Sequence, residues 1–421
     1  MSPDPIATAA LPAGAANRIV AGGWRGSWSD LPDLALPPVS AVLADDNLQA
    51  ATAAWQHART PGETLLVAAG RVPDSLAKEL ADDGFAVVRP QSTTESTSES
   101  TSPPTTPPTH SRPAEPGRLW LLTSGSTGRP KRVAHTLASL TTVGGEQPPR
   151  RWLCPYTPGA YAWWQVVTLS LAHPGQDVVF VETDELDGWP ALALAEGVTA
   201  ASGTPTFWRQ ALWRSGETVA RLPLQQITLG GEPVDQAILD QLIALFPAAR
   251  ISWIYASSEA GASIAVHDGM AGFPVAWLDR SAPGRPRLTV RDNELLIESQ
   301  WSADGMDAVL HTGDRVEIVD GRVLITGRIA SDEINVGGSK VSAAAVRAVL
   351  LSHPAVVWAQ VKGRRAPIVG QVVAAELVLA EPVSEQELTA WCAERLADYA
   401  VPRRLRFLDE IPIKETLKSD V

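Results

Sequence analysis

Short apolar runs alternate with helical patterns early in the chain, and this rhythm limits the available folds more than any other feature. The apolar runs are SAVLAD (40–45), TLLVAAG (64–70) and FAVVRP (85–90). Between them lie NLQAATAAWQHAR (47–59) and DSLAKELADDG (74–84), which have the pattern of helices. Alternation of strand and helix favours a parallel, doubly wound sheet, so we predict an α/β fold.

The character of the sequence changes after VLITGR (323–328). Four strand-like runs follow with two helices between them, which is typical of an α+β unit. One of these helices is expected to begin at Ser384, and its apolar face makes Cys392 a core residue. A chain of 421 residues can hold one large domain and one smaller one. We therefore expect an N-terminal domain over 1–327 and a small C-terminal domain over 328–421.

Composition excludes several classes of protein. A net charge of −12 argues against a nucleic-acid partner, which requires a basic face. Two cysteines cannot build a disulfide framework or a cysteine-rich zinc site. The sequence begins without the pattern of a signal peptide, and no apolar run reaches the roughly 18 residues of a membrane span. We expect a cytoplasmic protein without a membrane span.

Residues 91–117 are rich in Ser, Thr and Pro and have almost no apolar side chain. Such a segment buries too little surface to order itself, so we interpret it as a flexible insertion in the N-terminal domain. A mucin-like stalk is the alternative, but no secretion signal supports one.

The stretch LLTSGSTGRPKRVAHT (121–136) places hydroxyls and glycines between an apolar run and a basic one. Glycines let backbone N–H groups converge on a ligand, and the cations add charge, so the loop suits a polyphosphate. It is not a Walker A loop, because Arg129 and Pro130 separate Gly128 from Lys131. By itself it could equally be a solvated surface turn.

Four more stretches share this unusual composition. They are WIYASSEAG (253–261), VLHTGDRVEI (309–318), ITGRIASDEINVGGSKV (325–341) and DEIPIKETLKSDV (409–421). In this order, and with the 121–136 loop, they resemble the adenylate-forming superfamily of acyl- and aryl-CoA synthetases, peptide-synthetase adenylation domains and luciferases. The resemblance runs from about Leu119 to the end of the chain.

The resemblance implies an enzyme that binds ATP and activates a carboxylic acid as an acyl-adenylate. Lys418 and Glu259 would be catalytic, with Glu259 also a ligand of Mg²⁺, a hard cation that prefers oxygen. Asp314 would bind the ribose with support from Arg328. The remaining residues of the implied ATP site are Thr123, Ser124, Gly125, Ser126, Thr127, Gly128, Lys131, Tyr255 and Ser258.

The resemblance also implies a second half-reaction, in which a thiol attacks the activated acyl group. The C-terminal domain would be mobile and would swing about a hinge between Arg328 and Glu333, with Ala330, Ser331 or Asp332 as its centre. Gly337, Gly338 and Lys340 would then face the pantetheine arm of coenzyme A or of an acyl carrier protein.

The acyl pocket of the family corresponds here to TPGAYAWWQVV (157–167), ASGTPTFW (201–208) and LGGEP (229–233). No Asp is present in the first of these to bind an α-ammonium, so an apolar or aromatic acid is favoured over an amino acid. Helix core is the alternative for its tryptophans. The predicted pocket residues are Tyr161, Trp164, Gly203, Gly230 and Gly231.

Three functions remain open from the sequence. The first is an AMP-forming acid–thiol ligase, which makes an acyl- or aryl-CoA. The second is an adenylating enzyme that loads a carrier protein or an amine. The third is an inactive adenylate-binding scaffold, against which the intact charged residues argue. The sequence also departs from the family pattern, with Leu417 in place of the glycine that precedes the terminal lysine.

Overall fold

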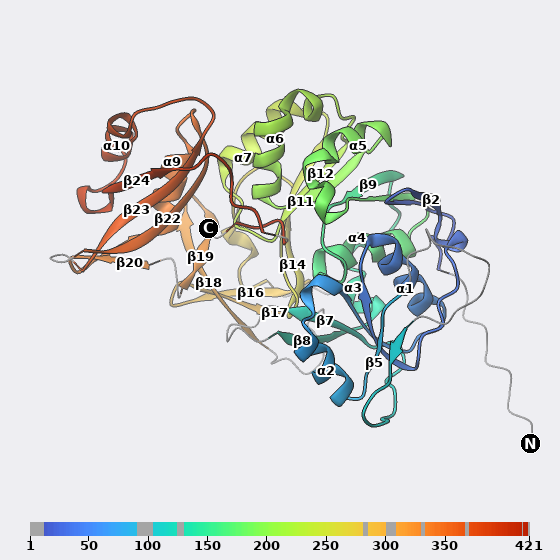
Figure 1. Ribbon diagram of the computed structural model, residues 1–421. Coiled ribbons are helices and arrows are strands. Elements are labelled where there is room, and N and C mark those ends of the chain that lie inside the picture. Colours follow the sequence, from blue (N-terminus) through green and yellow to red (C-terminus); the bar gives the residue numbers. More distant parts are fainter. Residues whose placement is uncertain are drawn as a thin grey trace, which may run out of the picture. The chain divides into compact units, whose positions relative to one another are not determined.

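The computed structural model describes residues 12–90, 104–123, 130–280, 285–299, 309–329, 333–366, 370–414 and 416–419. Figure 1 labels the helices and strands along the chain. The chain divides into two compact units. The first unit comprises Met1–Ala201, Ser257–Gly261 and Trp301–Met306, and the second comprises Ser202–Ala256, Ala262–Gln300 and Asp307–Val421.

One sheet of the first unit has the strand order β6-β5-β3-β4-β7-β8. Strands β3, β4, β5 and β7 run parallel, and β6 and β8 are antiparallel edge strands. The strands are β3 (Val39–Ala44), β4 (Glu63–Ala68), β5 (Ala86–Val88), β6 (Thr105–Thr106), β7 (Leu119–Thr123) and β8 (Lys131–His135).

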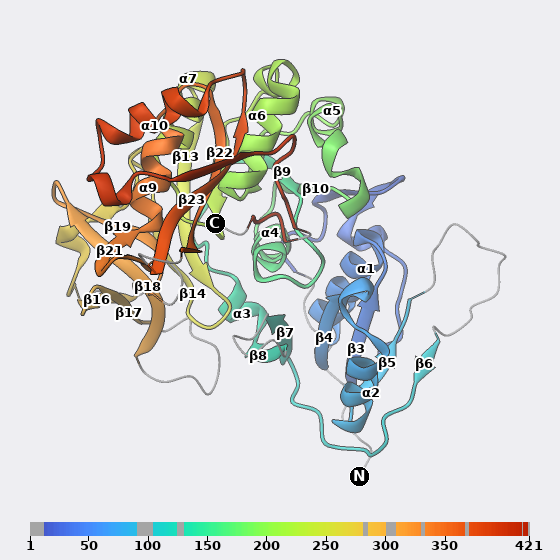
Figure 2. The same cartoon turned by 60° about the vertical axis from the view of Figure 1, so that its left-hand side comes forward.

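The apolar runs of the sequence form the centre of this sheet. All six residues of β3 are buried, as expected for a central parallel strand. Helix α1 (Asn47–Arg59) begins where the Asp46 carboxylate caps the amide of Gln49, and it lies beside β3 and β4 in Figure 2. Helix α2 (Asp74–Asp82) adds Leu80 to the core of β3 and β4.

A second set of strands in the first unit has the order β11-β9-β10-β1-β2. Its inner strands are parallel, and β2 is antiparallel to β1. Its elements, with the remaining helices of this unit, are β1 (Arg18–Ala21), β2 (Trp24–Ser27), β9 (Arg150–Cys154), β10 (Gln176–Phe180), β11 (Ala200–Gly203), α3 (Leu137–Leu140), α4 (Tyr161–Ala172) and α5 (Trp189–Ala195).

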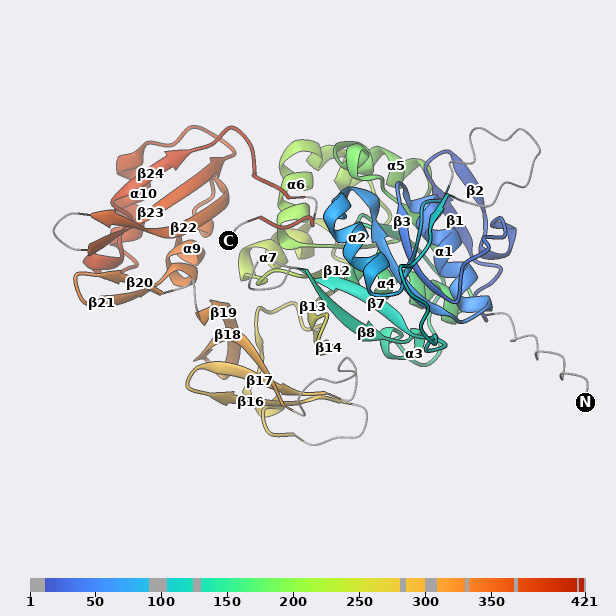
Figure 3. The same ribbon diagram turned by 60° about the horizontal axis from the view of Figure 1, so that its bottom comes forward.

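The second unit begins with parallel strands and helices and continues as antiparallel sheet. Strand β12 pairs in parallel with β13, and β14 lies beyond β13. A five-stranded sheet follows in the order β15-β19-β18-β17-β16, drawn in yellow and orange in Figure 3. These elements are α6 (Pro205–Ala220), β12 (Gln226–Gly230), α7 (Gln236–Leu245), β13 (Arg250–Ser257), β14 (Gly261–Val266), β15 (Phe273–Pro274), β16 (Arg287–Arg291), β17 (Glu294–Glu298), β18 (Leu310–Val319) and β19 (Arg322–Arg328).

The last part of the chain forms a sheet with its own core. Strands run in the order β21-β20-β23-β22, with β24 beside β23. Helix α10 begins at the predicted cap Ser384, and Cys392 is fully buried with Leu388 against this sheet, which confirms its role in packing. The elements are β20 (Glu333–Val336), β21 (Ser339–Ser342), α9 (Ala343–Leu351), β22 (Val356–Ala366), β23 (Gly370–Leu379), α10 (Glu385–Ala393) and β24 (Arg404–Phe407).

The predicted α/β class, with a large sheet-containing N-terminal part and a smaller C-terminal α+β part, is confirmed. The boundary predicted at residue 327 and the mobility of the C-terminal part stay predictions, and residues 330–332 of the expected hinge lie outside the described residues. Within the described ranges, no helix is both long and apolar enough to cross a membrane.

The Ser/Thr/Pro-rich segment differs from the expectation over its second half. Residues 91–103 lie outside the described residues, but 104–117 make specific contacts. Strand β6 pairs with β5, and Arg112 forms an ion pair with Glu63, whose side chain is 0% exposed. Trp120 donates an indole hydrogen bond to the same carboxylate at 2.8 Å. A buried carboxylate needs such partners, so these contacts hold residues that composition alone marks as flexible.

Candidate functional site

A buried carboxylate on β18 organises the charged residues of the second unit. Asp314 is 8% exposed and accepts a hydrogen bond from the Tyr255 hydroxyl of β13. Its other oxygen lies 3.1 Å from Nε of Arg328, which is the register partner of Asp314 on β19. Burial raises the pKa of Asp314, while Tyr255 and Arg328 oppose that rise. The antiparallel pairing of β18 and β19 therefore brings together two residues that the sequence predicted to cooperate.

The Arg328 guanidinium also donates to the carbonyl of Thr312 at 2.6 Å, while its side chain remains largely exposed. Desolvation and the charge of Asp314 raise the pKa of Tyr255, so this phenol stays protonated and continues to donate. The cluster presents one buried carboxylate and one accessible cation. A ribose hydroxyl could donate to the first while an anion meets the second.

Lys418 belongs to the same electrostatic group. Its side chain is exposed but closely surrounded by protein atoms, and this partial desolvation lowers the pKa of its ammonium. The carboxylates of Glu232 and Asp314 raise that pKa, and Arg328 lowers it further. An accessible, crowded lysine beside carboxylates can place a mobile positive charge on a bound anion.

The predicted pocket glycines have identifiable neighbours in the second unit. A Cβ atom on Gly231 would lie 3.1 Å from Cε of Lys418, so the absence of a side chain makes room for that lysine. A Cβ atom on Gly203 would lie 2.3 Å from the Phe207 ring, and one on Gly230 would lie 3.1 Å from the carbonyl of Ile254. All three glycines therefore meet parts of the chain itself in this conformation.

Leu417 takes the place of a glycine and keeps a glycine-like conformation. Its φ is +61°, in the left-handed region, and its side chain is only 1% exposed. The amide of Leu417 donates to the carbonyl of Lys414, and the amide of Lys414 donates to the carbonyl of Lys418, both at 2.9 Å. Burial of the leucine offsets the backbone strain of this turn.

Strands β7 and β8, which flank the predicted phosphate loop in the sequence, pair as an antiparallel hairpin in the first unit. Thr123 ends β7 and Lys131 begins β8, and the two are register partners. Lys131 is exposed. The loop residues Ser124, Gly125, Ser126, Thr127 and Gly128 lie outside the described residues.

A buried histidine connects this hairpin to the segment that carries Ser258 and Glu259. His135 of β8 is 1% exposed, and its ring contacts the carbonyl of Ser258 through Nε2 at 2.7 Å and the hydroxyl of Ser139 through Nδ1 at 2.9 Å. Glu259 is half-buried. Sequence reasoning missed His135, although it stands four residues after Lys131 in the stretch 121–136.

The two aromatic pocket candidates have different environments. Tyr161 is half-buried at the start of α4, with its ring centroid 6.0 Å from that of His135. Trp164 is 1% exposed and packs edge-on against Trp163 at 5.1 Å. These contacts favour the alternative interpretation of Trp164 as helix core.

The predicted thiol-acceptor residues form an exposed hairpin between β20 and β21. Gly337 and Gly338 have φ values of +57° and +92°, as a tight two-residue turn requires. Lys340 is exposed, with its ammonium 3.0 Å from the carboxylate of Glu333. Apart from Gly338 itself and its two neighbours in the chain, no described residue has an atom within 4 Å of a Cβ placed on Gly338, so one side of this turn is open.

Comparison with known proteins decides the family. Residues 39–299 match the family described as AMP-binding enzyme, and residues 345–418 match the AMP-binding enzyme C-terminal domain. The chain belongs to the AMP-binding enzyme family. The adenylate-forming resemblance predicted from the sequence is thereby confirmed.

Relatives of this AMP-binding enzyme include the 2-succinylbenzoate--CoA ligase of Bacillus cytotoxicus, 28% identical over 325 residues. The protein of the same name from Bacillus licheniformis is 30% identical over 325 residues. Both alignments cover 69% of this chain, and the chain spans only 66% of the length of these relatives. A variant of E. coli MenE with bound OSB-AMS has a similar fold, with a TM-score of 0.71 at 19% identity over 94% of this chain and 93% of that chain.

Proposed function

We propose that this AMP-binding enzyme is an ATP-dependent, AMP-forming ligase that activates an apolar or aromatic carboxylic acid and transfers it to a thiol. The observation that carries the proposal is the group formed by Asp314, Arg328 and Lys418, in a chain of this family. The ligase names of the relatives support the same reaction.

In the first half-reaction, a carboxylate oxygen of the acid attacks the α-phosphorus of ATP and pyrophosphate leaves. Both reactants are anions, so positive charge aimed at the developing phosphorane should contribute most of the catalysis. Lys418 supplies that charge from an accessible position. Asp314 accepts hydrogen bonds from the ribose, and Arg328 orients Asp314.

The phosphate loop, from Thr123 to Lys131, holds the pyrophosphate end of ATP in this proposal. Glu259, which is half-buried, would supply a carboxylate oxygen to Mg²⁺, and that ion would neutralise phosphate charge. Ser258 and Tyr255 line the nucleotide site, and Tyr161 belongs to the acyl pocket.

In the second half-reaction, the thiol of coenzyme A or of a carrier protein attacks the acyl carbonyl and AMP leaves. The hairpin of Gly337 and Gly338, with Lys340, guides the pantetheine arm. The open side of Gly338 supports this assignment, because a narrow chain can approach the backbone there.

The proposal is tested by measuring pyrophosphate release with ATP and Mg²⁺ across a panel of aryl, aliphatic and amino acids, with and without coenzyme A. We expect aryl or apolar acids to give pyrophosphate, and coenzyme A to give the acyl thioester. Pyrophosphate release without a thioester, together with formation of an amide when an amine is added, would favour the amine-acceptor alternative. Folded protein that binds AMP but releases no pyrophosphate with any acid would favour the inactive scaffold.

A further inference from the structure

Ser419, directly after the proposed catalytic lysine, has three polar partners in the second unit. Its amide donates to Oε1 of Glu232 at 2.8 Å, and its hydroxyl lies 2.8 Å from Oγ1 of Thr206. The indole N–H of Trp358 donates to the same hydroxyl at 3.0 Å. Ser419 is 7% exposed and Trp358 is 2% exposed, so these hydrogen bonds are shielded from water.

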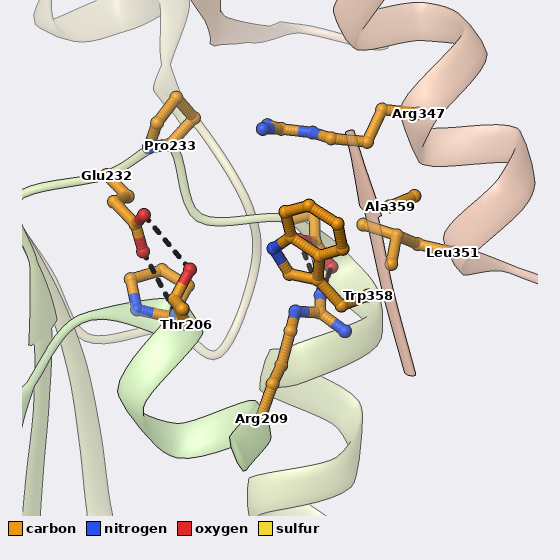
Figure 4. Close-up of a pocket in the computed structure, with 10 residues that line it drawn as sticks. Thr206, Arg209, Glu232, Pro233, Arg347, Leu351, Trp358 and Ala359 are labelled. Carbon is orange, nitrogen blue, oxygen red and sulfur yellow. Dashed lines mark hydrogen bonds and ion pairs between the residues drawn. The ribbon is translucent and has the colours of Figure 1, made fainter. Parts of the chain in front are cut away.

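The partners of Ser419 are themselves fixed. The carboxylate of Glu232 accepts hydrogen bonds from the amide of Thr206 at 2.9 Å and from the hydroxyl of Thr206 at 3.0 Å, as the dashed lines in Figure 4 show. Trp358 of β22 and Arg209 of α6 line the same small pocket. Arg209 in turn pairs with Asp235 at 2.6 Å. A serine hydroxyl placed among such groups has little freedom.

The residue before the lysine is held as well. The hydroxyl of Thr204 donates a hydrogen bond to the carbonyl of Leu417. The same hydroxyl oxygen accepts a hydrogen bond from the amide of Phe207, and Thr204 thereby caps the N-terminus of α6. The backbone is therefore tied to the start of α6 on both sides of Lys418. Only the lysine side chain, which makes no hydrogen bond to the described residues, extends from this fixed base.

We propose that Ser419 is a positioning residue, and that its hydrogen bonds to Glu232, Thr206 and Trp358 form a latch that presents Lys418 for adenylation. The inference rests on the proposed function. A backbone held on both sides of Lys418 limits the orientations that its side chain can adopt, so less conformational entropy is lost when the ammonium meets a bound substrate. Hydrogen bonds are net weak, so the latch can also open when the second half-reaction requires the lysine to leave.

The latch predicts different effects on the two half-reactions. Ser419→Ala should slow single-turnover adenylate formation about 10-fold, because it removes the hydrogen bonds of the Ser419 hydroxyl with Thr206 and Trp358. Trp358→Phe, which keeps an aromatic side chain but loses the indole N–H donor and part of the buried packing, should slow it severalfold. Thioester formation from a chemically prepared acyl-adenylate should change less than twofold in both. Ser352→Ala, a matched serine that is exposed at the end of α9, should leave both half-reactions unchanged.

A double-mutant comparison separates positioning from general damage. If Ser419 acts only through Lys418, Ser419→Ala should cause no further loss in a Lys418→Ala background. An equal loss in both backgrounds would overturn the latch, as would a Ser419→Ala protein that adenylates at the wild-type rate.

Hydrogen exchange tests the latch without using activity. Ser419→Ala should speed amide exchange in residues 416–419, whereas Ser352→Ala should not. Unchanged exchange in Ser419→Ala would overturn the latch. If the wild-type protein releases no pyrophosphate with any acid, the proposed function fails, and faster tail exchange would still show that Ser419 docks the tail.

Discussion

The hydroxyl of Tyr255 donates a hydrogen bond to the carboxylate of Asp314, although 59 residues separate them in the sequence. Tyr255 lies on β13 and Asp314 lies on β18, so this hydrogen bond connects the parallel strands of the second unit to its antiparallel sheet. Asp314 thus has one oxygen fixed by a neutral donor and the other fixed by Arg328.

Tyr255→Phe should therefore weaken nucleotide binding without abolishing catalysis. Loss of the donor leaves a buried carboxylate with one fewer hydrogen bond, which costs about 1–3 kcal/mol. We expect the Michaelis constant for ATP to rise about 10-fold and kcat to fall less. Steady-state pyrophosphate release measures both. A fall in kcat alone would place Tyr255 in the chemical step.

The ion pair between Glu63 and Arg112 should determine how much of the Ser/Thr/Pro-rich segment is dispensable. Arg112→Met leaves the fully buried Glu63 without its cation and should cost about 2–3 kcal/mol at pH 7, below the usual value for a buried pair because Arg112 is 25% exposed. Deletion of residues 92–103 should cost little, because closure entropy grows slowly with loop length. Urea unfolding gives the free energy of unfolding of both variants. If the substitution and the deletion lower that free energy equally, Arg112 does not distinguish the second half of the segment from the first.

The same pair predicts a pH dependence of stability. Burial alone would raise the pKa of Glu63, but hydrogen bonds from Arg112, Trp120 and the amide of Glu115 lower it below its usual value of 4.5. Because the folded pKa is lowered, the stabilisation is present above pH 4.5 and is lost as the pH falls through the folded value. The difference between wild type and Arg112→Met should therefore shrink in acid.

The sequence predicted the elements of this fold well, because local pattern determines them. The SAVLAD run covers all of β3 except Val39, and every residue of β3 is buried, while the TLLVAAG run covers all of β4 except Glu63. The resemblance to the adenylate-forming superfamily implied that Asp314 and Arg328 act together, and the two residues are register partners on adjacent strands.

What the sequence could not predict depends on contacts between distant residues. Arg112 looked dispensable in a polar segment, and its partner Glu63 stands 49 residues earlier. Ser419 was not predicted as a site residue, and its partners lie 61 to 213 residues away. The stretches LGGEP and LKSD contain Glu232 and Ser419, but nothing in their spacing indicates that they meet.

Leu417 gives a prediction in which glycine should be better tolerated than alanine. Leu417→Ala keeps the left-handed φ of +61° and loses a buried side chain, whereas Leu417→Gly loses the side chain but relieves the strain. We expect the free energy of opening of residues 416–419 to be about 1 kcal/mol higher in the glycine variant than in the alanine variant. Hydrogen exchange of residues 416–419 measures it. Equal protection in the two variants would show that the turn is not strained.

The pH dependence of adenylation should reveal the charge on Lys418. Partial desolvation lowers its pKa from the usual 10.5, so the rate should decline with rising pH as this ammonium loses its proton. Glu232→Gln removes a carboxylate that raises this pKa, and should shift the alkaline decline to lower pH. Glu217→Gln, an exposed matched change on α6, should not shift it. An unshifted decline in Glu232→Gln would assign the titration to another group.

The two half-reactions should respond in opposite ways to changes at Lys418 and Gly338. Lys418→Ala should slow adenylate formation about 10²-fold or more, as loss of a major electrostatic stabiliser does. It should spare thioester formation from prepared acyl-adenylate. Normal adenylation by Lys418→Ala would show that this lysine is only part of a solvated tail.

Gly338→Leu should slow thioester formation and spare adenylation, because a leucine there would crowd the approach of the pantetheine arm. The residue has a φ of +92°, so part of any loss could come from backbone strain in the hairpin. Gly321→Leu is the matched control, since Gly321 has a φ of +75° in the turn between β18 and β19 and equally open surroundings. Single-turnover assays of each half-reaction compare the variants. If Gly338→Leu and Gly321→Leu impair thioester formation equally, strain explains the loss and the hairpin does not guide the thiol. If Lys418→Ala and Gly338→Leu each impair both half-reactions equally, the two halves do not use separate faces of the C-terminal part.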